Sequence, residues 1–284
     1  MTSLAHAKLN LTLEVLGRRD DGYHEIKTVI QTIDLADRLQ FSPSSRLRVE
    51  CNVESLNDEA NLVWKAAQSL AEAGGIEPRV RIDIEKHIPT SMGLGGGSSD
   101  AACALFSLND FWDLNKSQED LAEIAAGIGS DVPFFLQGGT ALAEGRGELV
   151  SPLPPLPSVP VILICPDIEL PNKTTAMYSK LTPASFSDGG VTRRMVQILA
   201  GGQFVGDSVG GLIQNAFDEV AWLGFPDLSP VRQVLDQMAP GRFHLSGAGP
   251  ALFALPAGQS ERQAVADALQ PYGVGVYLVH TMSP

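Results

Sequence analysis

The feature that most constrains this chain is the run Ile88-Pro89-Thr90-Ser91-Met92-Gly93-Leu94-Gly95-Gly96-Gly97-Ser98-Ser99-Asp100. Its four glycines within five residues permit positive φ angles and a close approach of the backbone to a ligand. Beyond it, apolar residues recur at helical spacing from Ala101 to Trp112. A loop that leads into a helix N-terminus offers free N–H groups and a positive dipole end, which together form an anion site. The alternative is an ordinary flexible loop with a helix cap.

This glycine-rich loop fits neither of the common nucleotide-binding patterns. A Walker A loop ends in Gly-Lys-Ser/Thr, whereas Gly97 is followed directly by Ser98. The pattern G-x-G-x-x-G also fails, because Ser98 stands where a third glycine should follow Gly93 and Gly95. The loop therefore predicts a phosphate-binding site but does not indicate which fold the protein adopts.

The N-terminal segment has the clearest periodicity. Residues 5–15 alternate between apolar and polar, which predicts a strand with one buried face. Lys8 and Asn10 then project from the polar face, about 7 Å apart along the strand. They are either solvated surface residues or part of a site. Residues 18–22 form a turn, and a second strand is expected from there to about residue 35.

The segments around the loop read as helices and strands. A helix is expected to begin at Asn57 or Asp58 and to end near Ala73, and a strand over residues 80–85 leads into the loop. After the loop helix, Ser117 is expected to cap another helix that ends near Gly127.

One carboxylate, Asp131, stands between a glycine turn and an apolar run that contains Pro133. It is either the N-cap of a short helix or a functional group. The two roles can coexist, because a cap position holds a carboxylate rigidly.

A proline-rich stretch divides the chain. Residues 151–160 contain five prolines and no charged side chain, which is typical of a semi-rigid connector. We therefore expect two domains, residues 1–155 and 156–284. The second reads as strand, helices, strand, strand, helix, strand, the order of a ferredoxin-like domain. Ser246-Gly247-Ala248-Gly249-Pro250 forms a second glycine-rich turn between its middle strands.

Composition excludes several classes of partner. A net charge of −13 argues against nucleic acid and against an anionic membrane surface. Cys51, Cys103 and Cys165 have neither metal-binding spacing nor an even number for disulfides, so we expect reduced thiols in a cytoplasmic protein. No secretion signal is evident, and the longest apolar run, residues 161–165, is too short to cross a bilayer.

Three segments in this order resemble the motifs of the GHMP kinase superfamily of small-molecule kinases: Ala7-Lys8-Leu9-Asn10, residues 89–99 and residues 246–250. Two more, Arg18-Arg19-Asp20-Asp21-Gly22-Tyr23-His24 and Gly129-Ser130-Asp131-Val132-Pro133-Phe134-Phe135, are similar to members whose acceptor carries a cytidine diphosphate group. The resemblance covers essentially the whole chain. It implies an α+β, two-domain GHMP kinase fold, with a ribosomal protein S5 domain 2-like N-terminal domain and a ferredoxin-like C-terminal domain.

The resemblance also implies a reaction: ATP, with Mg²⁺, phosphorylates the 2-hydroxyl of a methylerythritol unit in non-mevalonate isoprenoid biosynthesis. Asp131 matches the general base that takes the proton of the acceptor hydroxyl. Lys8 matches the cation that orients this carboxylate and offsets charge on the phosphoryl group, and Asn10 matches a substrate-positioning group. No carboxylate cluster indicates a metal site, although Ser99 could contact the ion.

The other implied site residues bind the two nucleotides. Tyr23 is expected to stack on the cytosine, His24 to hydrogen bond to it, and Tyr178 to lie on its other face. The remaining acceptor contacts are Thr174, Gly247 and Gly249. The implied ATP contacts are Pro89, Thr90, Ser91, Met92, Gly93, Leu94, Gly95, Gly96, Gly97, Ser98 and Ser99, with Asn61 and Lys86 near the adenine.

Two alternatives remain. A homoserine, mevalonate or galactose kinase of the same superfamily would have no base for Tyr23 and His24 to bind. A non-catalytic nucleotide-binding domain would not need both Lys8 and Asp131. The sequence leaves the oligomeric state open between a monomer and a homodimer.

Overall fold

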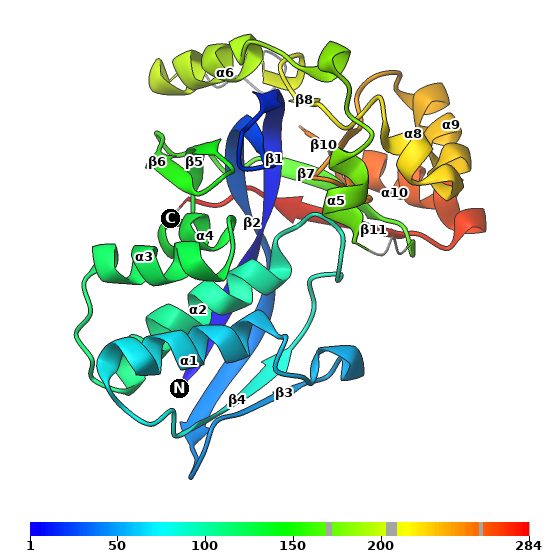
Figure 1. The fold of residues 1–284 in the computed structure, drawn as a ribbon. Coiled ribbons are helices and arrows are strands. Elements are labelled where there is room, and N and C mark those ends of the chain that lie inside the picture. Colours follow the sequence, from blue (N-terminus) through cyan, green and yellow to red (C-terminus); the bar gives the residue numbers. More distant parts are fainter. Residues whose placement is uncertain (169–171, 203–208, 256–257, 284) are drawn as a thin grey trace.

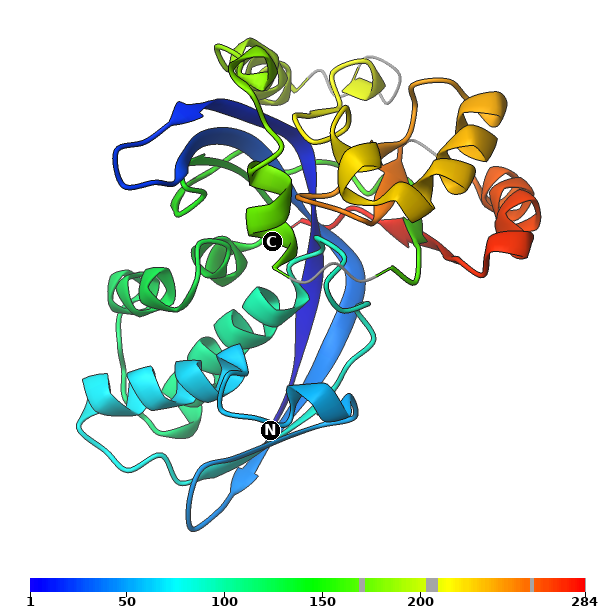
Figure 2. The ribbon, with the colours of Figure 1, turned by 45° about the vertical axis from the view of Figure 1, so that its right-hand side comes forward.

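A long β-hairpin runs through the centre of the molecule (Figures 1 and 2). Its strands, β1 (Thr2–Arg18) and β2 (His24–Pro43), pair antiparallel along almost their whole length. The structure is a computed structural model that describes residues 1–168, 172–202, 209–255 and 258–283.

The polar face of β1 is buried, which corrects the expectation of one exposed face. Helices α2 (Gly96–Phe111) and α6 (Gly190–Ala200) both contact β1. Lys8 and Asn10 are only 3% and 5% exposed, and they alternate with core residues as predicted.

Among the residues that the structure describes, seven strands form the larger sheet. Their order is β3-β4-β2-β1-β8, and β5 pairs with both β2 and β6. Strand β2 has two neighbours on one edge because it is 20 residues long: residues 26–31 pair with β5 and residues 38–43 with β4. The further strands are β3 (Arg48–Cys51), β4 (Val80–Glu85), β5 (Thr140–Gly145), β6 (Leu149–Pro152) and β8 (Gln214–Asn215).

Helices α1 (Leu62–Gly74), α2, α3 (Gln118–Ile128) and α4 (Val132–Gln137) pack together beside this sheet (Figure 1). The expected start of α1 at Asn57 or Asp58 is wrong, because the side chain of Asn61 accepts the Val63 N–H and forms the N-cap. Helix α2 also begins earlier than expected, inside the glycine run. The predicted Ser117 capping box of α3 is confirmed.

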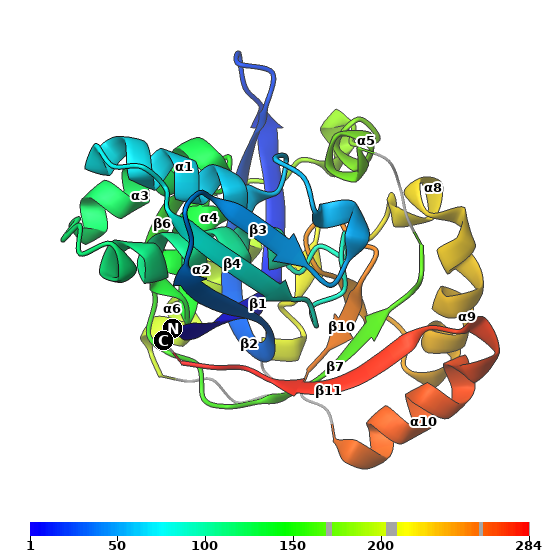
Figure 3. The same ribbon diagram turned by 90° about the horizontal axis from the view of Figure 1, so that it is seen from below.

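A smaller antiparallel sheet, in the order β11-β7-β10-β9, lies beside the hairpin. Alternate side chains of β7 enter two different hydrophobic cores. Val161 and Leu163 pack in the core that contains Leu9, whereas Ile162 and Ile164 pack in the core that contains residues of α9 and α10. Helices α9 (Ser229–Met238) and α10 (Gln259–Leu269) thus cover its outer face (Figure 3). The predicted element order is confirmed for β7 (Pro160–Cys165), β9 (His244–Leu245), β10 (Leu252–Ala254), α10 and β11 (Gly275–His280).

The chain after the proline-rich connector returns to the larger sheet. Strand β8 pairs parallel with β1, so the two sheets are joined by more than the connector, and the boundary at 155/156 stays a prediction. The remaining helices are α5 (Lys173–Tyr178), α8 (Ala221–Gly224) and the 3₁₀ turns Glu54–Leu56, Pro183–Ser185, Pro226–Leu228 and Gln270–Tyr272. Among the described residues, no helix has the length and apolar character needed to span a membrane.

Candidate active site

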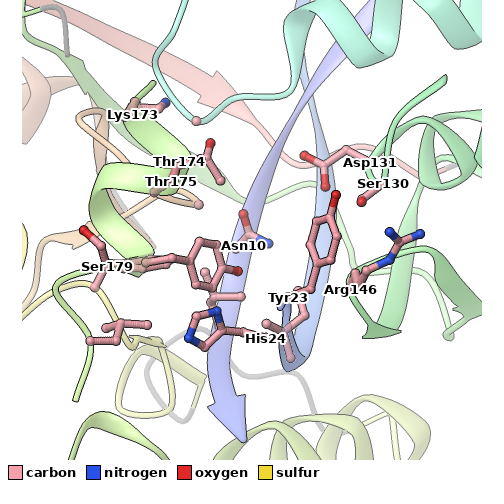
Figure 4. Close-up of a pocket in the computed structure, with 18 of the residues that line it drawn as sticks. Asn10, Tyr23, His24, Ser130, Asp131, Arg146, Lys173, Thr174, Thr175 and Ser179 are labelled. Carbon is pink, nitrogen blue, oxygen red and sulfur yellow. The ribbon is translucent and has the colours of Figure 1, made fainter. Parts of the chain in front are cut away.

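A cavity of about 1040 Å³ lies between the hairpin, the glycine-rich loop and helix α5 (Figure 4). It gathers residues from segments far apart in the sequence. The predicted site residues that line it are Lys8, Asn10, Tyr23, His24, Gly93, Gly95, Ser98, Asp131, Thr174, Tyr178 and Gly247.

Lys8 and Asn10 form a buried polar pair on β1. The ammonium of Lys8 donates to Asn10 Oδ1, and Asn10 Nδ2 donates to Thr28 Oγ1 at 2.8 Å on the neighbouring strand. Burial lowers the pKa of Lys8, while the charge of Asp131 acts in the opposite direction. Lys8 and Asp131 thus place a cation and a carboxylate in the wall of the same cavity.

Asp131 occupies the N-cap position of α4, but its side chain makes no capping hydrogen bond. No other described residue donates to this carboxylate, and Figure 4 shows it directed into the cavity beside the ring of Tyr23. Its backbone position is thus fixed by the helix start while its oxygens stay available to a ligand.

The glycine-rich loop ends at a helix N-terminus with the free N–H groups that an anion site needs. Gly95 is the N-cap of α2 with φ 72°, so the N–H groups of Gly96, Gly97 and Ser98 have no partner inside the helix. A Cβ on Gly95 would lie 2.6 Å from the Phe135 ring and 3.1 Å from Lys8 Cγ, so this position, whose φ is also positive, requires glycine. The loop is tied to β1 by the Lys8 N–H, which donates to the Leu94 carbonyl at 3.0 Å.

The second glycine-rich turn packs directly on the loop and on the polar pair. A Cβ on Gly93 would lie 2.0 Å from the Ser246 carbonyl oxygen, and Ser246 Oγ donates to the Gly93 carbonyl at 3.0 Å. A Cβ on Gly247 would lie 3.2 Å from Lys8 Nζ and 3.4 Å from Asn10 Oδ1. The tertiary structure therefore brings the three predicted motifs into contact.

Aromatic side chains, those of Tyr23, His24 and Tyr178, line a part of the cavity that we call its aromatic end. Tyr23 is 54% exposed, and the Arg146 guanidinium lies 4.7 Å from the centroid of its ring. The His24 and Tyr178 rings stack at 4.8 Å with an interplanar angle of 27°. The sequence suggested Tyr23 and Tyr178 on the two faces of a base, whereas here the ring on Tyr178 is that of His24.

Asn61 and Lys86 do not line the cavity. The side chain of Asn61 caps α1, and the ammonium of Lys86 is buried in ion pairs with Asp37 and Asp100. Burial raises the pKa of Asp100 to about 7. Asp37 also accepts the N–H of Ile88 at 2.8 Å, so this cluster holds both ends of the glycine-rich loop. Any contact of Lys86 with adenine stays a prediction.

Ser98, rather than Ser99, is presented to the cavity. Ser99 is buried and its hydroxyl donates to the His6 carbonyl at 2.7 Å. Across the described ranges, no group of three or more His, Cys, Asp or Glu side chains could hold a metal ion. The other predicted residues that do not line the cavity are Pro89, Thr90, Ser91, Met92, Leu94, Gly96, Gly97 and Gly249.

Sequence reasoning missed several residues of the cavity. Lys173 directly precedes Thr174, so it could have been noticed as a cation next to a predicted site residue, whereas Arg146, between two glycines after β5, lies in none of the motifs. The apolar wall had no sequence signal, because its residues come from unrelated segments. The missed residues include Arg18, Ser130, Arg146, Lys173, Thr175, Ser179, Phe186 and Phe217.

Comparison with known proteins relates this architecture to a family. The model of the GHMP kinase N-terminal domain matches residues 61–139. The chain is 40% identical to the 4-diphosphocytidyl-2-C-methyl-D-erythritol kinase of Dehalococcoides mccartyi, over 100% of this chain and 99% of the relative. It is 36% identical to that of Pelotomaculum thermopropionicum, with the same coverage. A crystal structure of 4-(cytidine 5'-diphospho)-2C-methyl-D-erythritol kinase covers both chains fully at 34% identity and a TM-score of 0.81.

These relations define the class as a GHMP kinase, an ATP-dependent small-molecule kinase, and they confirm the expected α+β GHMP kinase fold. Mevalonate kinase from L. major shares the fold, with a TM-score of 0.73, 100% coverage of this chain and 96% of that chain, but only 16% identity. The chain belongs to the family of 4-diphosphocytidyl-2-C-methyl-D-erythritol kinases, because relatives of that name match its whole length at 36–40% identity.

Proposed function

We propose that this protein transfers the γ-phosphoryl group of ATP to the 2-hydroxyl of 4-diphosphocytidyl-2-C-methyl-D-erythritol, in the non-mevalonate isoprenoid pathway. The observation that carries the proposal is one cavity whose wall combines a helix N-terminus, the side chains of Lys8 and Asp131, and an aromatic end. The names of the full-length relatives supply the acceptor.

In the proposed reaction, Asp131 accepts the proton of the 2-hydroxyl while that oxygen bonds to the γ-phosphorus. The bond from the γ-phosphorus to the β–γ bridging oxygen breaks, and ADP leaves. Lys8 offsets charge on the transferred group, Asn10 holds the Lys8 ammonium in place, and the amides at the start of α2 bind the phosphates. A magnesium ion, when bound, would neutralise phosphate charge, with the Ser98 hydroxyl as a protein donor on the cavity wall.

The cytidine is assigned to the aromatic end. Tyr23 supplies an exposed ring for stacking, His24 a hydrogen bond, and Tyr178 and Thr174 a wall on α5. We further propose two domains divided at 155/156 and a cytoplasmic enzyme without nucleic acid or membrane partners, which the net charge of −13 and the free cysteines support.

A substrate panel tests this assignment. With ATP as donor, we expect turnover of the cytidine diphosphate acceptor and none of homoserine or mevalonate, because those acceptors lack a base. Release of ADP, measured by a coupled assay, reports each reaction. Turnover of homoserine or mevalonate in place of the cytidine compound would refute the proposed acceptor.

Replacing Tyr23 with Ala should raise the KM for the cytidine acceptor. Loss of base stacking worth about 1–3 kcal/mol corresponds to about 5- to 150-fold. Steady-state kinetics would measure the KM for each substrate, and the KM for ATP should not change. Tyr23→Phe should stay close to wild type because it keeps the ring. Tyr272→Ala, at an exposed tyrosine outside the cavity, is the matched control. An unaltered acceptor KM in Tyr23→Ala would rule out stacking on this ring.

A further inference from the structure

Lys173 is a cation of the cavity to which the reaction above gives no role. It is the first residue of α5, directly before Thr174, and lines the same cavity as Lys8 and Asp131. Its side chain extends from α5 toward the glycine-rich loop (Figure 4). The residue therefore reaches from the acceptor side of the cavity to the proposed phosphate site.

The ammonium of Lys173 donates to two main-chain carbonyls, that of Ser91 at 2.7 Å and that of Gly249. An ammonium has three hydrogens to donate. Within the ranges that the structure describes, the third hydrogen of the Lys173 ammonium has no acceptor, and no carboxylate forms an ion pair with this ammonium. Two neutral carbonyls orient the group but do not neutralise it, so an anionic ligand would complete its environment.

Charged groups on neighbouring elements act on Lys173. Burial and repulsion from Lys8 on β1 lower the pKa of Lys173 to about 8, while Asp131 at the start of α4 raises it. Tyr178 on the same helix stays neutral, because burial raises its pKa. Two ammonium groups that repel one another beside a helix N-terminus form a site suited to a polyanion.

We propose that Lys173 binds the γ-phosphoryl group of ATP as a second ammonium, in addition to Lys8. This inference rests on the proposed kinase reaction. Lys173 donates its third hydrogen to a non-bridging γ-oxygen and keeps its proton throughout, so the transfer of the acceptor proton to Asp131 is unchanged. The carbonyls of Ser91 and Gly249 hold the ammonium in position for this contact.

Nucleotide binding to Lys173→Met provides the first test. Loss of a charged hydrogen bond should weaken binding of the β,γ-imido analogue of ATP about tenfold or more, and leave ADP binding within about twofold. Isothermal titration calorimetry measures both without the acceptor, so failure here is separable from failure of the proposed function. Equal losses for the two nucleotides, or no loss, would overturn the proposal, because a purely structural role does not distinguish them. Lys180→Met, two residues after α5 and outside the cavity, is the matched control.

The pH profile of Lys173→Arg provides a second test. In the wild type, kcat/KM for ATP should fall as the pH rises through about 8, where the free ammonium loses its proton. Arginine keeps its charge, so in Lys173→Arg the decrease in kcat/KM for ATP should occur at a higher pH. A fall that stays near pH 8 in Lys173→Arg would assign this titration to another group and contradict the proposal.

Discussion

Replacing Asp131 with Asn should lower kcat by about 10²- to 10⁴-fold, the usual contribution of a general base. The amide keeps the size of the side chain but cannot accept the proton of the hydroxyl. Because the Asp131 side chain makes no capping hydrogen bond, α4 should start normally in the variant and the thermal unfolding midpoint should stay close to that of wild type. Steady-state phosphorylation of the cytidine acceptor measures the effect, and the KM for ATP should change little.

A matched control separates this effect from a general loss of charge. Asp227 is exposed, lies in a 3₁₀ turn and does not line the cavity, so Asp227→Asn should behave as wild type. A wild-type kcat in Asp131→Asn would show that another group, or none, takes the proton.

Replacing Lys8 with Met should lower kcat by about 10²- to 10³-fold, as expected for one group that stabilises developing charge. Methionine fills a similar volume, and removal of a buried charge leaves Asn10 with its hydrogen bond to Thr28. The fold should therefore survive, as circular dichroism would verify. The main effect should be on kcat, because the phosphoryl charge that Lys8 offsets grows during transfer.

Lys65 offers the control for this prediction. It is an exposed lysine on α1, outside the cavity, and Lys65→Met should leave both kcat and KM unchanged. If Lys8 and Asp131 act as a unit, the double variant should lose little more activity than Asp131→Asn alone. A Lys8→Met enzyme with full kcat would exclude the lysine from the chemistry.

Much of the fold could be predicted from local patterns. The alternation in residues 5–15, the Ser117 capping box and the element order after residue 160 all correspond to observed structure. These features depend on interactions between residues that are close together in the sequence, so they can be predicted without the tertiary structure. The start of α1 was predicted too early, because Asn57, Asp58 and Asn61 are all good caps and local chemistry does not choose among them.

The site was predictable to a smaller extent. The motifs predicted five site residues that all line one cavity: Lys8, Asn10, Gly93, Gly95 and Asp131. The role of Lys86 was not foreseeable, because its partners Asp37 and Asp100 come from β2 and α2. The stacking of His24 on Tyr178 likewise joins residues more than a hundred positions apart.

The sequence by itself determined the glycine-rich loop, the alternation that places Lys8 beside Asn10, and the order of most elements after residue 160. Backbone sterics and periodicity act within a few residues, so these needed no tertiary information. Only the tertiary structure decided that the polar face of β1 is buried, that Gly93 meets Ser246, and that Lys173 reaches the loop. Such contacts depend on how distant elements pack, since close packing selects the partners that fit.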